Sequence, residues 1–191
     1  EETFLTGVSR LLPGHCLTLS SGKNLFIERW WNTLDHLQTV PPNYCEQVTY
    51  FKKLFIDACK IRMRNDVPTA SCLSGGLDSS SVFCSIMKIK ETVVPTEEVP
   101  ENSHIGFVAS YMNDIDNEVE YAKEVITHTK STAYYFEIDQ CNLLNEYFDI
   151  IYSYENISDI HIGPWLLFKK MRDLGIYVSI DGHGGDELLA G

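Results

Sequence analysis

Two glycine-rich turns hold the residues of this sequence whose types and spacing could do chemistry. The first turn reads SGGLDSS over residues 74–80 and separates an apolar run from a segment with helical spacing. Its glycines let the backbone bend sharply and approach a ligand without a Cβ in the way. Backbone N–H groups at the start of the following helix, together with the serine hydroxyls, can then bind pyrophosphate oxygens. The phosphate-binding residues that this pattern predicts are Ser74, Gly75, Gly76, Ser79 and Ser80.

Two carboxylates accompany these turns. Asp78 would repel a phosphate unless a cation lay between them, and Mg²⁺ prefers oxygen ligands. The second turn reads DGHGGDE over residues 181–187 and contributes Asp186. Because two acids at the ends of different strands can flank one metal-bound pyrophosphate, we expect Asp78 and Asp186 to be catalytic and to bind Mg²⁺. The alternative is structural: the first turn would be a tight connection and both acids would stabilise helix dipoles.

Alternating helix and strand patterns must position these turns. Helical spacing of apolar residues covers residues 45–64, 77–88, 118–130, 142–154 and 164–174, and strand-like runs cover residues 69–73, 105–111, 133–138 and 176–180. Strands that alternate with helices of this length predict a parallel sheet covered on both faces. In open sheets of this kind ligands bind beyond the carboxyl ends of the strands, and both glycine-rich turns lie at those ends.

The N-terminal part follows a different pattern. Residues 1–31 predict a β-hairpin, which is marginal in water by itself and therefore needs a partner surface. Residues 32–44, with two adjacent prolines, indicate a linker. The polar residues 91–104, which include Pro95 and Pro100, predict a mobile surface loop.

Composition excludes several classes of function. The net charge of −12 argues against nucleic-acid binding and against binding to anionic membranes, which both need a basic face. The six cysteines form no C-x-x-C pair, and the six histidines are scattered, so we expect reduced, mostly buried thiols in a cytosolic protein and no metal cage of these residues. We expect no signal peptide and no membrane span, because the apolar runs are too short.

The first turn matches the S-G-G-x-D-S loop of the N-type ATP pyrophosphatases, and the chain most closely resembles the synthetase domain of the asparagine synthetases. The segment RNDVP at residues 64–68 and the stretch DGHGGDELLAG at residues 181–191 are also typical of that domain. Residues 7–15 are similar to the last part of the family's glutaminase domain. The resemblance implies a doubly wound parallel α/β sheet of the adenine-nucleotide alpha-hydrolase type, Rossmann-like, with an N-terminal β-hairpin remnant.

The resemblance also implies a reaction and its cofactors. ATP and Mg²⁺ would activate a carboxylate as an acyl-adenylate, pyrophosphate would leave, and ammonia or an amine would attack. The first turn would hold the pyrophosphate, and backbone groups near two further residues would hold adenine. The cofactor-binding residues implied outside the first turn are Leu73, Ala109, Gly184 and Gly185.

Two positions depart from the family pattern. An arginine that the family carries near the start of the late helix has no counterpart among residues 159–162. Asparagine synthetases commonly place a glutamate, associated with the aspartate substrate, where this sequence has His183. The acceptor is therefore expected to be a small-molecule or peptide carboxylate other than free aspartate, as in relatives that close β-lactam or lasso-peptide amide bonds. His183 could act as a base near neutral pH, and a histidine hydrogen-bonded in a tight loop is the alternative.

The resemblance divides the chain into three parts: residues 1–31 as the end of a glutaminase-like domain, 32–44 as a linker, and 45–191 as a C-terminally truncated synthetase domain. We therefore expect a fragment that binds nucleotide without completing turnover, from a parent that could form a homodimer. A nucleotide-binding domain without ligase activity is the rival hypothesis. A tRNA-modifying role is disfavoured by the net charge of −12, and sulfur transfer by the lack of a paired reactive cysteine.

Overall fold

The computed structural model describes residues 2–22, 24–92, 104–111, 118–138, 143–155 and 161–189. The chain forms two compact units, Glu1–Val48 and Thr49–Gly191, and the division falls within helix α1, Tyr44–Arg62. The described ranges contain no helix that is both long and apolar enough to cross a membrane.

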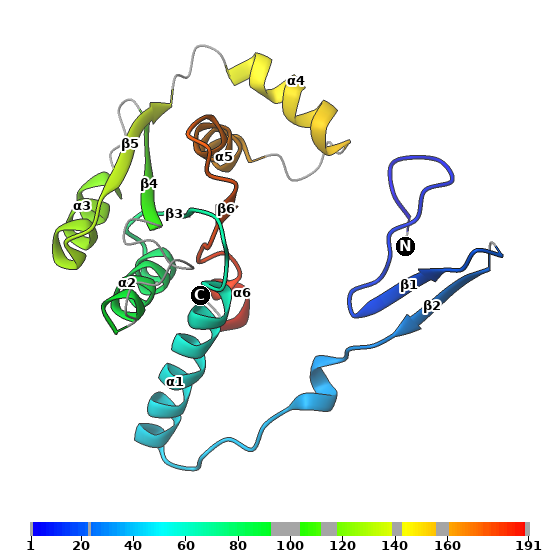
Figure 1. Cartoon of the computed structure of the whole chain (residues 1–191), viewed down its shortest axis with the longest axis horizontal. Coiled ribbons are helices and arrows are strands. Elements are labelled where there is room, and N and C mark those ends of the chain that lie inside the picture. Colours follow the sequence, from blue (N-terminus) through cyan, green and yellow to red (C-terminus); the bar gives the residue numbers. More distant parts are fainter. Residues whose placement is uncertain are drawn as a thin grey trace. The chain divides into compact units, whose positions relative to one another are not determined.

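The first unit contains the predicted hairpin. Strands β1, His15–Leu19, and β2, Leu25–Arg29, pair antiparallel (Figure 1), with Leu17 opposite Ile27. Both of these apolar side chains are exposed. The predicted linker is not featureless, because the 3₁₀ turn η1, Thr33–His36, lies within it. Its backbone is held by the bond from the N–H of Asp35 to the carbonyl of Asn32 at 3.0 Å, and the ring of His36 stacks on that of Trp31 at 4.0 Å.

The second unit is built on a parallel sheet of four described strands. These are β3, Thr69–Cys72; β4, His104–Tyr111; β5, Ala133–Ile138; and β6, Val178–Ser179, in the order β5-β4-β3-β6. The strand expected over residues 176–180 is too long. Strand β6 comprises only Val178 and Ser179. Before it the N–H of Ile176 donates to the carbonyl of Met171 in the preceding helix, and after it the N–H of Ile180 still donates to the carbonyl of Ala70 in β3.

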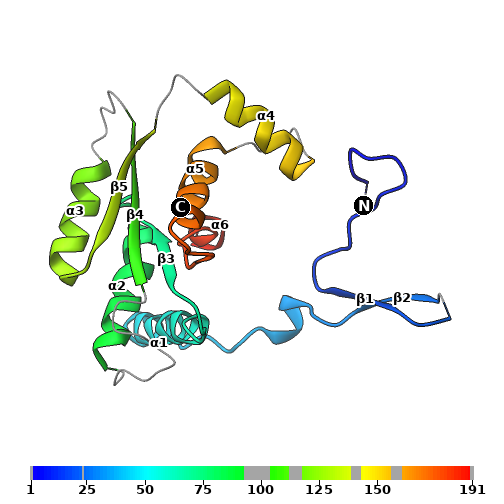
Figure 2. The same cartoon turned by 45° about the horizontal axis from the view of Figure 1, so that its top comes forward.

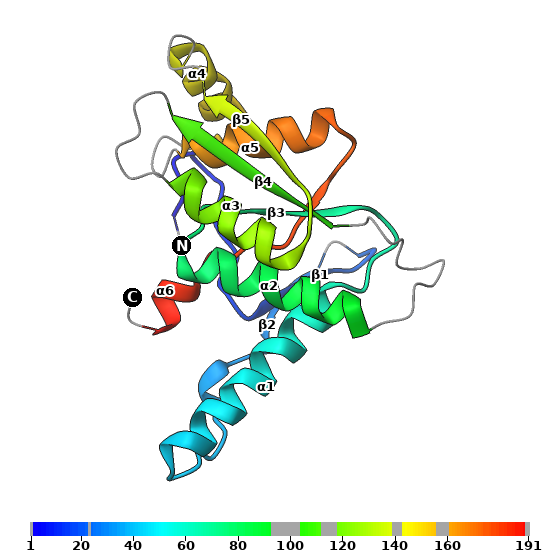
Figure 3. The ribbon, with the colours of Figure 1, turned by 90° about the vertical axis from the view of Figure 1, so that its left-hand side faces the viewer.

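Helices cover both faces of this sheet, which confirms the doubly wound α/β fold. Helices α2, Leu77–Thr92, and α3, Glu118–Thr129, lie on one face, and α5, Ile162–Asp173, lies on the other (Figures 1 and 3). Side chains alternate along the strands as a pleated sheet requires. Val108 packs with Phe83 of α2 on one face, whereas Phe107 packs with Met171 of α5 on the other.

The remaining helices pack on other helices. The C-terminal half of α1 covers α2 through Phe55 and Cys59, which contact the cluster around Ile86. Helix α4, Leu143–Tyr154, lies beside α5 (Figure 2) and buries Ile150 completely. A short final helix, α6, Gly185–Leu189, follows the second turn.

Two expectations need correction, and part of one of them falls outside the described ranges. Helix α2 runs to Thr92 and β4 begins at His104, so the predicted loop over 91–104 is shorter, and residues 93–103 lie outside the described ranges. The five described cysteines are free, as expected, but Cys16 and Cys45 are exposed and only Cys59 is buried. Cys16 lies in the hairpin, whose side chains are nearly all exposed, and Cys45 lies in the first turn of α1.

Candidate functional site

A pocket of about 410 Å³ opens at the carboxyl ends of β3, β4 and β6. Its position agrees with the rule that ligands of doubly wound sheets bind where the strand order reverses, here between β3 and β6. Nine of the predicted site residues line this pocket: Leu73, Ser74, Gly76, Asp78, Ser79, Ala109, His183, Gly184 and Asp186. Three predicted residues do not line it: Gly75, Ser80 and Gly185.

The first turn is organised by its own hydroxyl groups. The Oγ of Ser74 accepts a hydrogen bond from the N–H of Gly76 at 3.2 Å and lies 3.1 Å from the Oγ of Ser79. The N–H of Ser80 donates to the carbonyl of Gly76 at 3.0 Å, which closes the first turn of α2. The earliest N–H groups of an α-helix have no acceptor within the helix. The turn therefore presents hydroxyl and N–H donors to the pocket, which suits an anion.

Gly75 supports the turn and does not line the pocket. Its φ of +83° is in the left-handed region, and a Cβ there would lie 2.6 Å from the backbone nitrogen of Ala122 in α3. The missing side chain thus lets the turn pack directly on α3. The Oγ of Ser80 is buried and has no hydrogen-bond partner among the described residues, so its predicted phosphate contact stays a prediction.

The second turn packs on the first through its glycines. A Cβ on Gly182 would lie 2.7 Å from the carbonyl carbon of Asp78 and 2.7 Å from the nitrogen of Ser79. A Cβ on Gly185 would collide with the carboxylate of Asp78. Side chains at these two positions would push the turns apart. Their absence brings Asp78 and Asp186, which are 108 positions apart in the sequence, to one pocket.

Asp181 is a pocket residue that sequence reasoning missed. Its Oδ1 accepts hydrogen bonds from the backbone N–H of Cys72 at 2.6 Å and from the hydroxyl of Ser179 at 2.8 Å. Burial, and secondly the charge of Asp181, raise the pKa of the Cys72 thiol to about 12. The thiol therefore stays protonated and forms a neutral part of the wall. The sequence signal that could have identified Asp181 is its place as an acidic residue between a predicted strand and a glycine-rich turn.

Acidic groups dominate the pocket. The lining carboxylates are Asp78, Glu118, Asp181, Asp186 and Glu187. Among the described lining residues His183 is the one basic side chain, and it is exposed. The described part of the chain holds no group of three or more histidine, cysteine or acidic side chains arranged to hold a metal ion. Two carboxylates that share an ion with phosphate oxygens and water fit Mg²⁺, which usually keeps several such ligands.

A buried polar cluster holds the second turn from beneath. The hydroxyl of Ser71 donates to the carbonyl of Ile180, the residue before Asp181, so it must accept from the Nε2–H of His104 at 2.9 Å. The Nδ1 of His104 then accepts from the hydroxyl of Thr69 at 2.8 Å. Burial lowers the pKa of His104 from 6.5 to about 4, with Lys90 as the second cause, so the ring is neutral near pH 7.

Comparison with protein families agrees with this geometry. The model of the family described as "Asparagine synthase" matches residues 50–191, which include both turns and every strand of the parallel sheet. The chain belongs to the asparagine synthase family. This match confirms the resemblance that the two turns predicted.

Individual relatives extend the match toward the N-terminus. The chain is 29% identical to the protein named "Amidase chyE" of Penicillium rubens over 100% of the chain and 30% of that protein. It is 28% identical to a glutamine-hydrolysing asparagine synthetase of Sandersonia aurantiaca over 94% of the chain and 34% of the enzyme. The chain thus spans about a third of the length of these curated relatives.

Solved structures with similar folds are more distant. The glutamine-dependent NAD⁺ synthetase of Acinetobacter baumannii, in complex with ADP, has a TM-score of 0.49 at 16% identity and covers 88% of this chain and 32% of its own. The NH3-dependent NAD synthetase of Campylobacter jejuni has a TM-score of 0.46 at 15% identity and covers 74% of this chain and 58% of its own.

Proposed function

We propose that this chain provides the ATP site of a ligase that joins a carboxylate to ammonia or to an amine. The observation that carries the proposal is the packing of the second turn on the first, which brings Asp78 and Asp186 to one pocket beside a helix N-terminus. Membership of the asparagine synthase family supports it. ATP-dependent amide formation requires the pocket to hold a triphosphate, and the arrangement suits that charge only with a cation present.

In the proposed reaction a carboxylate oxygen attacks the α-phosphorus of ATP, and the bond from that phosphorus to the β-phosphate breaks. Pyrophosphate leaves, a nitrogen lone pair attacks the acyl-adenylate carbonyl, and AMP departs with the carboxyl oxygen. Bound Mg²⁺, held by Asp78 and Asp186, would neutralise charge on the phosphates. The chain contributes mainly positioning: the hydroxyls of Ser74 and Ser79 and the N–H groups at the start of α2 hold the pyrophosphate, and backbone groups at Leu73 and Ala109 hold adenine.

His183 is the pocket residue that concerns the choice of acceptor carboxylate. It is exposed, it lines the pocket, and it is the basic side chain among the described lining residues. We propose that it faces the acceptor, either as the base that takes a proton from the attacking nitrogen or as a cation beside the carboxylate. The expected acceptor is a carboxylate other than free aspartate, and formation of asparagine from free aspartate at a rate typical of asparagine synthetases would contradict this expectation.

The test is a calorimetric titration of Mg·ATP into this chain and into its Asp78→Ala and Asp57→Ala variants. We expect Asp78→Ala to weaken binding about tenfold or more, because a charge-assisted contact is lost. Asp57, exposed on α1 and outside the pocket, loses the same charge and should leave affinity unchanged. Equal affinities of all three folded proteins would contradict the proposal. Binding without pyrophosphate release in the presence of candidate carboxylates would favour the rival nucleotide-binding function.

A further inference from the structure

Strand β6 leaves β3 at the point where the second turn begins. Up to that point the two strands follow a parallel ladder, with Ala70 opposite Ser179, and the N–H of Ile180 donates to the carbonyl of Ala70 at 2.8 Å. A continued ladder would next pair the N–H of Cys72 with the carbonyl of Ile180. That N–H instead donates to the Oδ1 of Asp181, so the carbonyl of Ile180 does not receive its bond from the backbone of β3.

A side chain of β3 supplies the bond that the ladder does not. The hydroxyl of Ser71 donates to the carbonyl of Ile180, and both residues are buried. Because a buried carbonyl without a donor costs free energy, this bond allows the backbone to leave the sheet at Ile180. The residues that follow form the second turn, which brings Asp186 to the pocket. Ser71 does not line the pocket, so any effect of its hydroxyl on a ligand passes through this turn.

The hydrogen bonds around Ser71 run in one direction. The carbonyl of Ile180 can only accept, so the Ser71 hydroxyl donates to it and accepts from the Nε2–H of His104. The Nδ1 of the same ring then accepts from the hydroxyl of Thr69. In this tautomer His104 is a donor to Ser71, and it does not compete with the carbonyl for the hydrogen of the serine.

We propose that Ser71 is a positioning residue of the ATP site, whose hydroxyl sets where the second turn lies over the first and thereby where Asp186 meets the metal-bound phosphates. The proposal rests on the proposed function, in which Asp186 binds Mg²⁺. The two turns are in close contact, since a Cβ on Gly182 would lie 2.7 Å from the carbonyl carbon of Asp78. Ile180 is two residues before Gly182, so a shift of its carbonyl is transmitted to this contact. Mg²⁺ requires ligand distances of about 2.1 Å, and a small shift therefore weakens its binding.

The experiment is a double-mutant cycle on the calorimetric affinity of the chain for Mg·ATP, with Ser71→Ala, Asp186→Ala and the double variant. We expect Asp186→Ala to weaken binding about tenfold or more and Ser71→Ala about fivefold, because a displaced carboxylate keeps part of its contact. Since Ser71 acts through Asp186, Ser71→Ala should cost little further affinity once that carboxylate is gone. Losses that add in the double variant would overturn the proposal, and so would an unchanged affinity of Ser71→Ala.

Thr69→Val is the matched control. Like Ser71→Ala it removes a buried hydroxyl that bonds to His104, but it keeps the bond from Ser71 to Ile180. We expect Thr69→Val to leave the affinity for Mg·ATP unchanged. A general loosening of the buried cluster would weaken binding in both variants, and that result would overturn the proposal.

Circular dichroism establishes first that each variant is folded. If Ser71→Ala does not fold, Ser71→Cys takes its place in the same cycle, because a thiol keeps a weak donor at this position. Additive losses or an unchanged affinity would overturn the proposal in that cycle too. Absence of any Mg·ATP binding by the unaltered chain would instead overturn the proposed function.

Discussion

The sheet of the second unit carries two groups of polar side chains that differ in how they are satisfied. In its interior Thr69, Ser71 and His104 are 4%, 1% and 4% exposed, and they bond to one another and to the carbonyl of Ile180. At the carboxyl ends of the same strands the side chains of the two turns open to the pocket. Asp78 and Asp186 of this second group have no ion pair among the described residues.

The difference distinguishes polar residues that support the fold from polar residues that are available to a ligand. A buried polar group without a partner costs free energy, so the interior cluster is closed by the protein itself. The pocket group is left to water and ligand: its carboxylates are available to a cation, and the hydroxyl and N–H donors of the first turn are available to an anion. The two groups are also connected, since the Ser71 hydroxyl bonds the residue that precedes Asp181. A satisfied interior cluster is therefore bonded directly to the chain segment that leads into the pocket.

The largest effect should come from a residue that belongs to neither polar group. Gly75→Ala places a Cβ against the backbone of α3 in a left-handed conformation, and we expect it to lower the free energy of unfolding by about 3 kcal/mol or more. Gly175→Ala is the matched control, with a φ of +76° and nothing within 4 Å. It should cost about 1 kcal/mol. Urea unfolding followed by circular dichroism measures both, and equal costs would show that the close packing on α3 is unimportant.

The interior cluster should make stability depend on pH. The folded pKa of His104, about 4, lies below its ordinary 6.5, so the unfolded chain binds more protons between these values. The contribution is complete above pH 6.5 and is lost as the pH falls through 4, on the order of 3 kcal/mol in total. The free energy of unfolding of the chain and of His104→Gln is measured at pH 7 and at pH 4. The carboxylates change the stability of both proteins, so the difference between the two changes gives the contribution of His104. If the chain and His104→Gln lost the same free energy of unfolding between pH 7 and pH 4, His104 would not be the cause, and the contrast between the two polar groups would not hold.

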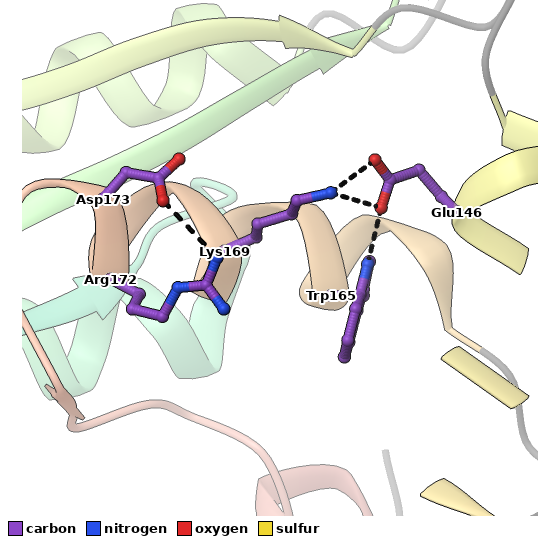
Figure 4. A network of polar contacts seen from close by, with 5 residues as sticks. All are labelled: Glu146, Trp165, Lys169, Arg172 and Asp173. Atoms are coloured by element: carbon purple, nitrogen blue, oxygen red, sulfur yellow. Dashed lines mark hydrogen bonds and ion pairs between the residues drawn. The ribbon is translucent and has the colours of Figure 1, made fainter. Parts of the chain in front are cut away.

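The smallest effect is expected for a polar cluster that is satisfied but near the surface. Glu146 of α4 accepts hydrogen bonds from Lys169 at 2.7 Å and from Trp165 at 2.8 Å, both on α5 (Figure 4). These bonds, that of Lys169 first, lower the pKa of Glu146. Glu146→Gln should cost less than about 1 kcal/mol, because solvent screens such pairs. If Glu146→Gln lowered the free energy of unfolding by as much as protonation of His104 does, burial would not explain the difference between these two clusters.

Strong local patterns allowed much of the fold to be predicted. Strand β5 occupies its predicted residues 133–138, and α3 ends at Thr129, one residue before its predicted end. These segments are long and regular, so local periodicity decides them. The pocket residues of the first turn could be named for a related reason: glycines and hydroxyls at a strand end have few structural uses besides tight turns and anion binding.

The missed features depend on long-range contacts. Strand β6 begins later than predicted, because the N–H of Ile176 bonds the carbonyl of Met171 in α5 and not the neighbouring strand. Asp181 was not chosen as a site residue, since its anchor on Cys72 joins positions 109 apart in the chain. His104, at the edge of a predicted polar loop, becomes a buried link between strands.

The sequence by itself determined the class of fold, the two turns, the identity of the acids and the family. Each of these depends on residue type and on spacing within a few residues. The tertiary structure alone decided which atoms share the pocket: Gly182 and Gly185 lie against Asp78, and Asp181 accepts a hydrogen bond from the N–H of Cys72 at the end of β3. Local spacing cannot specify such approaches, because they depend on how far each strand extends and on which side chains are absent where two backbones meet.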